Sequence, residues 1–163
     1  MTNEKEIDRN GTLFLENKEF LPLVIELTDK GHEVTLPVRG NSMRPFLSNT
    51  KDKAVLVKPS ECLRIGDVVL AEVSYGHYVL HRIIRIDGDL IQMQGDGNLY
   101  PDPVIPSVNV KAIAKGFIRN GRNRIDYVDG LYFKTYSIVW MGLRPVRRWI
   151  LAFFRKCNAV LRL

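Results

Sequence analysis

The sequence has few of the residues that hold disulfide-bonded or zinc-stabilised proteins together. It contains two cysteines, Cys62 and Cys157, no CxxC pair, and three histidines that form no cluster. A disulfide framework or a structural zinc site needs more of these residues at closer spacing, so both are excluded. We therefore expect no metal and no organic cofactor, and a reducing, cytoplasmic setting.

Long apolar runs are missing as well. The longest candidate, YSIVWMGL at 136–143, is far shorter than the ~20 residues that cross a bilayer. The first twelve residues, MTNEKEIDRNGT, are polar and mixed in charge, unlike a secretory signal. With 45 % hydrophobic and 26 % charged residues, the composition is typical of a globular domain with a real core.

Acidic residues are absent from the last part of the chain. Residues 131–163 contain seven Lys or Arg and no Asp or Glu, so residues 1–130 carry only −1 of the total charge of +6. A nearly neutral body predicts no nucleic-acid partner. Residues 144–163 alternate basic with aromatic and aliphatic side chains, which predicts a basic amphipathic helix starting near Pro145. Such a helix either lies on an anionic membrane surface or packs on the rest of the protein.

The rest of the chain predicts a mainly β protein. Residues 17–30 have apolar residues at helical spacing before Gly31, which indicates one short helix. Val- and Ile-rich strands separated by turn residues are expected at 33–38, 53–57, 67–73, 78–86, 90–94 and 110–119. We expect a coiled antiparallel sheet or open barrel. The chain then divides into a helical segment at 1–32, a β domain at 33–130 and the basic segment at 131–163.

The stretch RGNSMRPFL at 39–47 makes Ser42 a candidate nucleophile. A serine hydroxyl is weakly nucleophilic and needs a base, a group that orients the base, and backbone amides aimed at the developing oxyanion. Gly40 allows the sharp turn that exposes such amides. The alternative is an ordinary turn serine.

His81 is the candidate base. It lies in the strand YVLHRIIRI, on the same face as Val79 and Ile83. Burial among apolar residues favours the neutral imidazole, which suits a general base. The alternative is a core histidine bonded to a backbone carbonyl. His32 and His77 are expected in exposed loops.

Two aspartates are candidates to orient that base. The stretch QGDGNLYPDP at 94–103 places Asp96 between glycines and Asp102 between prolines. A rigidly held carboxylate beside a histidine selects its tautomer and stabilises the imidazolium. The alternative is turn chemistry alone, since the spacing of a calcium-binding EF-hand is absent. The sequence does not choose between the two aspartates.

Four motifs in this order resemble the signal peptidase I and LexA-type serine peptidase superfamily. GNSMRP resembles its SMxP nucleophile box, and LRIGDVVLAEV resembles the GDIV strand that follows. YVLHRIIRI resembles the strand that carries the base, and QGDGNLYPDP resembles the GD-x-N-x-x-x-D box. The resemblance covers residues 36 to about 119.

The resemblance implies a serine endopeptidase that cleaves a peptide or leader after small residues. Bacterial signal peptidases and LexA-type repressors use a lysine base, so His81 resembles the Ser-His branch of endoplasmic-reticulum-type and archaeal-type signal peptidases. In that branch Ser42 attacks, His81 transfers the proton, and Asp96 or Asp102 assists. The residues beside the nucleophile, Asn41 and Met43, are the implied substrate and oxyanion contacts.

The sequence also departs from these relatives. It shows neither the N-terminal membrane anchor of signal peptidases nor the DNA-binding helix-turn-helix of self-cleaving repressors. The substrate therefore stays open, and so does the location, which we expect to be cytoplasmic with optional peripheral contact at the inner membrane face. The alternative function is a catalytically inactive peptide-binding module or a membrane-surface adaptor of the same fold.

Overall fold

One antiparallel sheet forms the body of the protein. The computed structural model describes residues 17–49, 51–119 and 121–160, with side chains placed from Phe20 to Phe154. Eight strands pair in the order β1-β2-β7-β3-β4-β5-β6, and β8 pairs with β7. They are β1 Val34–Pro37, β2 Lys53–Val57, β3 Val68–Ser74, β4 His77–Asp87, β5 Leu90–Gln94, β6 Ile105–Pro106, β7 Val110–Ile118 and β8 Ile125–Tyr127.

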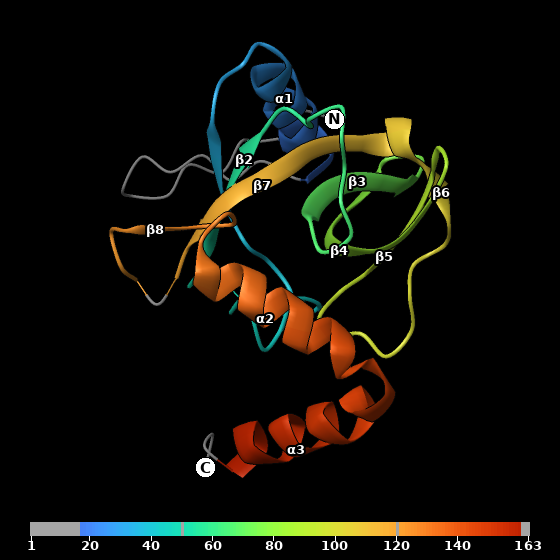
Figure 1. Cartoon of the computed structure of the whole chain (residues 1–163). Helices are drawn as coiled ribbons and strands as arrows, with labels where there is room; N and C mark the ends of the chain where they lie inside the picture. The colour runs from blue at the N-terminus through green and yellow to red at the C-terminus, as the bar shows by residue number, and fades with distance from the viewer. Residues whose placement is uncertain (1–16, 50, 120, 161–163) are drawn as a thin grey trace, which may run out of the picture.

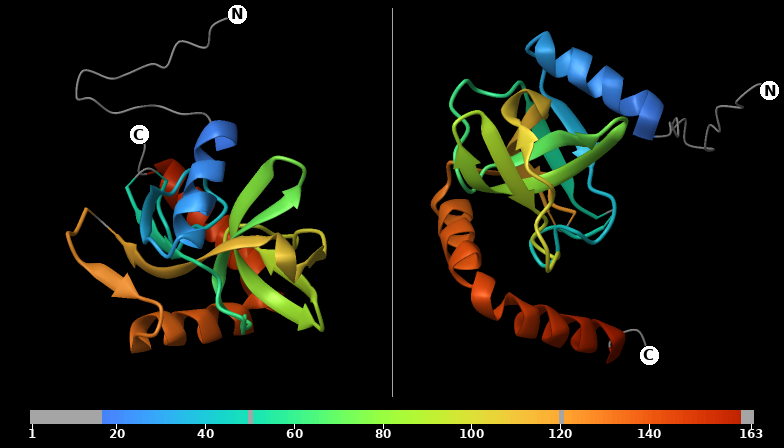
Figure 2. Two further views of the ribbon diagram at one scale, coloured as in Figure 1. Left: turned by 90° about the horizontal axis from the view of Figure 1, so that it is seen from above. Right: turned by 90° about the vertical axis from the view of Figure 1, so that its right-hand side faces the viewer.

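The expected β fold is confirmed. The sheet is strongly curved without closing into a barrel (Figures 1 and 2). Six of the strands lie at the positions that the Val- and Ile-rich stretches of the sequence predicted. The two that the sequence did not predict, β6 and β8, have only two and three residues, too few for a periodic pattern.

Apolar side chains fill both sides of the curved sheet. One cluster joins α1, β2, β7 and the turn after β1, and includes Val24, Leu47 and Phe117. The other includes Val69 of β3, Ile83 of β4 and Met93 of β5. The strand β3 contributes Val68 and Leu70 to the first cluster and Val69 and Ala71 to the second, because alternate residues of a strand point to opposite faces.

Three helices flank the sheet. The expected N-terminal helix is α1, Asn17–Asp29, which buries Leu21 and Val24. At the opposite end of the molecule, α2 spans Leu131–Gly142, and α3 spans Arg147–Val160 after one 3-10 turn, Arg144–Val146 (Figures 1 and 2). The predicted helix start near Pro145 is therefore confirmed.

The helix α2 was not predicted. It is apolar on most sides, so no amphipathic stripe marks it in the sequence. It buries Phe133, Ser137 and Trp140. Within the described ranges, no helix is both long and apolar enough to cross a membrane.

Candidate active site

The turn that carries Ser42 is anchored in the core on its C-terminal side. Residues 42–46 form consecutive turns after β1. Met43 and Phe46 are 2 % and 5 % exposed and join the first apolar cluster, whereas Ser42 is half-buried. The Leu47 N–H donates to the Met43 carbonyl at 2.9 Å. Apolar burial on one side thus holds the backbone of Ser42 at the surface of the core.

Two glycines let a second loop approach this turn. The Gly97 N–H donates to the Ser42 carbonyl at 2.7 Å. A Cβ at Gly95 would lie 2.5 Å from the Ser42 carbonyl oxygen and 3.0 Å from Nε2 of His81. Nε2 of His81 and the backbone of Ser42 therefore both lie next to Gly95. No larger residue fits at Gly95 without displacing the serine turn.

His81 is oriented by Asp102. Its imidazole is buried on β4, with 4 % of the residue exposed, and Nδ1 lies 2.6 Å from Oδ2 of Asp102. Asp102 is fixed in turn, since its N–H donates to the Met93 carbonyl at 2.8 Å. A carboxylate only accepts hydrogen bonds, so this contact selects the tautomer of the neutral imidazole in which Nδ1 carries the proton and Nε2 has a lone pair. That lone pair belongs to the nitrogen beside the Ser42 turn, which is the arrangement of a general base.

Asp96 has a different partner. Its two carboxylate oxygens accept from Nε and Nη2 of Arg82 at 2.9 and 2.8 Å. Both residues are 1 % exposed. The option that Asp96 orients His81 does not fit this geometry, because strand alternation turns Arg82 and His81 to opposite faces of β4.

The Arg82–Asp96 pair docks α2 on the sheet. Nη1 of Arg82 donates to the Ser137 hydroxyl at 2.6 Å and to the Gly66 carbonyl at 2.9 Å. The guanidinium carbon lies 5.2 Å from the ring centre of Phe133 and 5.6 Å from that of Tyr136. A buried charge is tolerated when every donor is satisfied in this way. The signal in the sequence was an arginine between Leu80 and Ile84 on an apolar strand face.

Burial also affects Tyr136 on α2. Its hydroxyl donates to Oδ2 of Asp96 at 3.4 Å. Removal from water raises the pKa of the Tyr136 phenol well above its ordinary value, and the negative charge of Asp96 adds to the effect. The pair and its tyrosine neighbour thus form a buried polar network behind the candidate site.

Asn41 and Met43, the two neighbours of Ser42, differ in whether their side chains can reach a substrate. Asn41 is exposed, whereas the Met43 side chain is in the core and cannot face a substrate. Among the hydrogen bonds of the described residues, none uses the N–H of Ser42 or Met43 as its donor. These two N–H groups remain available to an oxyanion.

The other two histidines are exposed, as expected. His32 lies in a loop, whereas His77, which we expected in a loop, is the first residue of β4. In the described part of the chain, no group of three or more His, Cys, Asp or Glu side chains could hold a metal ion. The candidate site therefore consists of Ser42, His81 and Asp102, with Gly95 between them.

Comparison with known proteins identifies the family of the chain. A protein-family model described as Peptidase S24-like matches residues 6–117, more than half of the chain. The match includes the serine turn, β4 and the loop with both aspartates, and it ends before α2. A search of curated proteins finds no significant match. The chain belongs to the Peptidase S24-like family.

Proposed function

We propose that the protein is a serine endopeptidase in which Ser42 is the nucleophile, His81 the general base and Asp102 its orienting carboxylate. One observation carries the proposal. Asp102 holds Nδ1 of a buried histidine, while the opposite ring nitrogen lies beside the turn of Ser42. A histidine that serves only for packing needs neither a carboxylate at one ring nitrogen nor the turn of a serine near the other.

The first half of the reaction forms an acyl-enzyme. Oγ of Ser42 attacks the scissile carbonyl as its proton passes to Nε2 of His81, and the imidazolium is stabilised by Asp102. The carbonyl oxygen becomes an oxyanion, which the N–H groups of Ser42 and Met43 can bind. When the intermediate collapses, the C–N bond breaks and His81 returns the proton to the leaving amine.

The second half releases the product. Water gives a proton to Nε2 of His81 as its oxygen attacks the ester carbonyl. Collapse of this intermediate breaks the bond to Oγ of Ser42, which recovers its proton from His81. The enzyme is restored and the peptide leaves as a carboxylic acid.

The resemblance to the Ser-His branch of signal peptidases suggests the substrate class. We expect an extended peptide or leader with small residues before the cleaved bond.

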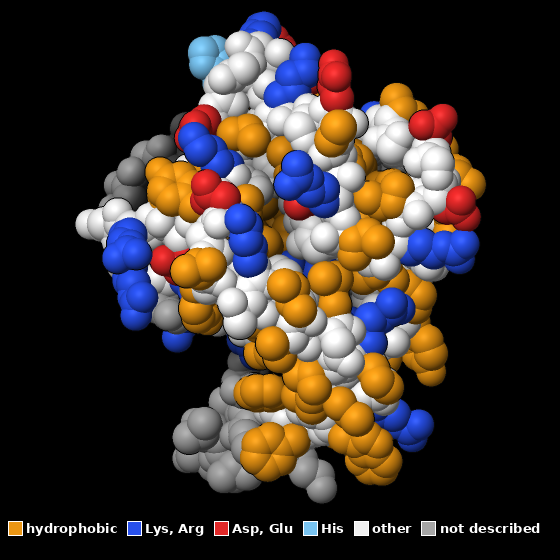
Figure 3. All heavy atoms as spheres, in the orientation of Figure 1, with side chains coloured by type: hydrophobic (Ala, Val, Ile, Leu, Met, Phe, Trp, Pro, Cys, Tyr) orange, Lys and Arg blue, Asp and Glu red, His pale blue; other side chains and the backbone are white. Residues whose placement is uncertain are grey.

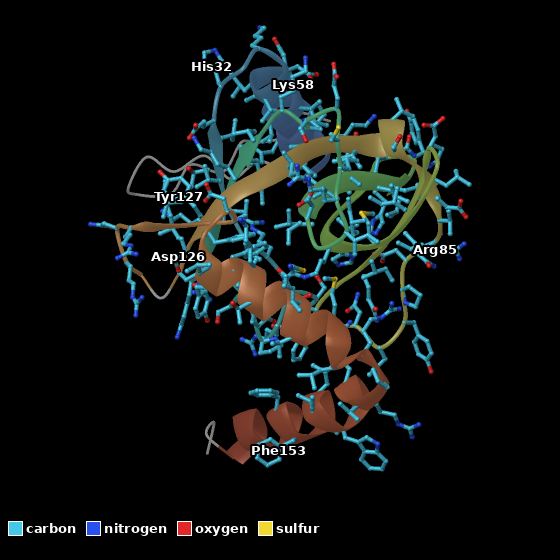
Figure 4. The ribbon with its side chains drawn as sticks, viewed as in Figure 1. His32, Lys58, Arg85, Asp126, Tyr127 and Phe153 are labelled. Carbon is cyan, nitrogen blue, oxygen red and sulfur yellow. The ribbon has the colours of Figure 1, made fainter. Side chains whose placement is uncertain are left out.

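A peripheral membrane contact through residues 144–163 is part of this proposal. Trp149 and Phe153 are 73 % and 66 % exposed, although aromatic residues of this size are usually buried. Apolar side chains gather over α2 and α3 (Figure 3), and Phe153 projects from the lower side of α3 (Figure 4). Exposed aromatics beside arginines, with no acidic residue in the segment, fit an anionic lipid surface.

Cleavage of a peptide library tests the enzyme directly. The native protein and its Ser42→Ala variant are incubated with peptides rich in small residues, and the products are read by mass spectrometry. Ser74→Ala is the matched control, because Ser74 is exposed at the end of β3. Cleavage that persists in the control and vanishes in Ser42→Ala supports the proposal.

Labelling with a serine-reactive fluorophosphonate separates the alternatives when no peptide is cut. Labelling of the native protein and not of Ser42→Ala shows an activated serine whose substrate is more specific than the library. Absence of labelling together with peptide binding contradicts the proposal and favours the inactive peptide-binding module.

A further inference from the structure

A pocket lies beside the loop that carries Asp102. It has a volume of about 670 Å³ and is bounded on one side by Gln94 and residues 99–101, and on the other by residues 144–148. The loop that carries Asp102 thus has two sides. One faces His81, and the other faces the junction between α2 and α3, where the yellow loop descends toward the red helix in Figure 1.

The charge of this pocket is of one sign. Arg144, Arg147 and Arg148 line it, and no acidic residue does. Arg144 and Arg148 are exposed. The helix α3 begins at Arg147, so its dipole adds partial positive charge at the same place. Three like charges repel one another, and an anion between them removes that repulsion.

Arg147 lacks acceptors for most of its N–H groups, although its guanidinium carbon lies 5.3 Å from the ring centre of Trp140. The residue is 3 % exposed, and its Nε and Nη1 are buried without a hydrogen-bond partner. Nη2 has one long bond, 3.5 Å to the Trp140 carbonyl. Asp96, the nearby carboxylate, already binds Arg82 with both oxygens. A buried guanidinium with unpaired donors is costly, and oxyanions are its usual partners.

One further atom lacks a partner in this pocket. Oε1 of Gln94 is buried and unpaired, while Nε2 of the same side chain donates to the Asn98 carbonyl at 2.9 Å. Two residues of the lining thus carry unpaired polar atoms, donors on Arg147 and an acceptor on Gln94, and these buried atoms reach a ligand when the side chains turn toward the pocket. A hydrogen phosphate or phosphate ester bearing a hydroxyl satisfies both kinds of atom, whereas chloride satisfies only the donors.

We propose that this pocket binds a phosphate group through Arg144, Arg147 and Arg148. The geometry favours phosphate because an arginine fork matches two phosphate oxygens, and the double negative charge of phosphate is attracted by all three arginines. The phosphate comes from a free phosphorylated compound or from a phospholipid headgroup. Binding is independent of the proposed peptidase activity, and only the lipid source depends on the proposed membrane contact.

Calorimetric titration of the full chain with inorganic phosphate is the first test. We expect a dissociation constant of about 1 mM or tighter, with sodium chloride of equal ionic strength giving no signal. Arg144→Gln and Arg148→Gln should each weaken binding by about ten-fold, because each removes one charge-assisted contact. Arg147→Met should abolish phosphate binding. If that variant does not fold, the variants of the exposed residues Arg144 and Arg148 still test the proposal.

Arg85→Gln is the matched control. Arg85 is exposed, pairs with Asp87 and lies on the sheet away from α3 (Figure 4). An equal loss of binding in this control would show general attraction to a basic protein and overturn the proposal. Absence of phosphate binding, together with vesicle binding that the pocket variants do not change, would overturn it as well.

Vesicles distinguish the two sources. Sedimentation with phosphatidylglycerol in phosphatidylcholine is compared with phosphatidylcholine alone, for the native protein, the pocket variants and Arg85→Gln. Binding that inorganic phosphate displaces, and that Arg144→Gln and Arg148→Gln reduce more than Arg85→Gln does, identifies a headgroup as the ligand. Phosphate binding without such vesicle binding identifies a free phosphorylated compound.

Discussion

Nδ1 of His81 lies 2.6 Å from Oδ2 of Asp102, while the next residue on β4, Arg82, is held by Asp96. Two aspartates from one loop thus engage two consecutive residues of one strand, on opposite faces. On one face the contact orients the histidine that we propose as the base, and on the other it fixes α2 to the sheet. Substitution of the two aspartates should therefore have different consequences.

Asp102→Asn should remove activity without unfolding the protein. An amide in place of the carboxylate can stabilise the wrong histidine tautomer and cannot stabilise the imidazolium, so kcat/KM should fall by about 10²–10⁴-fold. Asp102 is only partly buried, and the melting temperature should change little. A variant that keeps most of its peptidase activity would contradict the assigned role.

Asp96→Asn should destabilise the fold instead. It leaves the charge of Arg82 buried without its partner, a loss of about 3–5 kcal/mol in the free energy of unfolding. Urea denaturation followed by tryptophan fluorescence measures this, because Trp140 lies on α2. A change below about 1 kcal/mol would show that the pair contributes little to docking the helix.

Gly95→Ala should disrupt the candidate site. The new Cβ would meet the Ser42 carbonyl at 2.5 Å and His81 Nε2 at 3.0 Å, so the turn or the imidazole must move. A displacement of about 1 Å costs on the order of 10²-fold in rate. Gly142→Ala, whose Cβ meets nothing within 4 Å, is the control and should keep full activity. Equal activity of the two variants would contradict the assembled site.

Alkaline pH should test the burial of Tyr136. The folded state raises its pKa above the ordinary value of 10.0, so the unfolded chain releases this proton first. The stabilisation is fully present below about pH 10 and decreases as the pH rises beyond it. Urea denaturation at pH 8 and near pH 11 should show the native protein losing more stability than Tyr136→Phe. Parallel losses would mean that the phenol is more hydrated than the structure indicates.

Trp149→Ala and Phe153→Ala should weaken binding to phosphatidylglycerol vesicles. Each removes a large exposed aromatic side chain of α3, and its burial in the interface is worth about 1.5–3 kcal/mol, or roughly ten-fold or more in partitioning. Tyr75→Ala is the control, because Tyr75 is a fully exposed aromatic residue in the β3–β4 turn. If the control weakens vesicle binding as much, the contact does not run through α3.

The strands and α1 were predictable because their local patterns agree with the final fold. Alternating Val and Ile place β3, β4 and β7, and helical spacing with a glycine stop places α1. The pattern of α2 is not local, since Ser137 and Trp140 are buried only because Arg82 and the sheet lie beneath that helix. The residues of α2 alone therefore do not indicate which of its side chains are buried.

For the candidate site, the sequence by itself determined the residue types and their order: a serine in a glycine-containing turn, a histidine in an apolar strand, and two aspartates in one loop. The tertiary structure alone decided which aspartate meets the histidine. Asp96 and Asp102 are equivalent as local motifs, and the choice depends on how β5 pairs with β4. That register sets Arg82 opposite Gln94, just before the loop leaves the sheet. His81 and Arg82 face opposite sides of the sheet because they are consecutive residues of β4. The loop places Asp96 on the side of Arg82 and Asp102 on the side of His81.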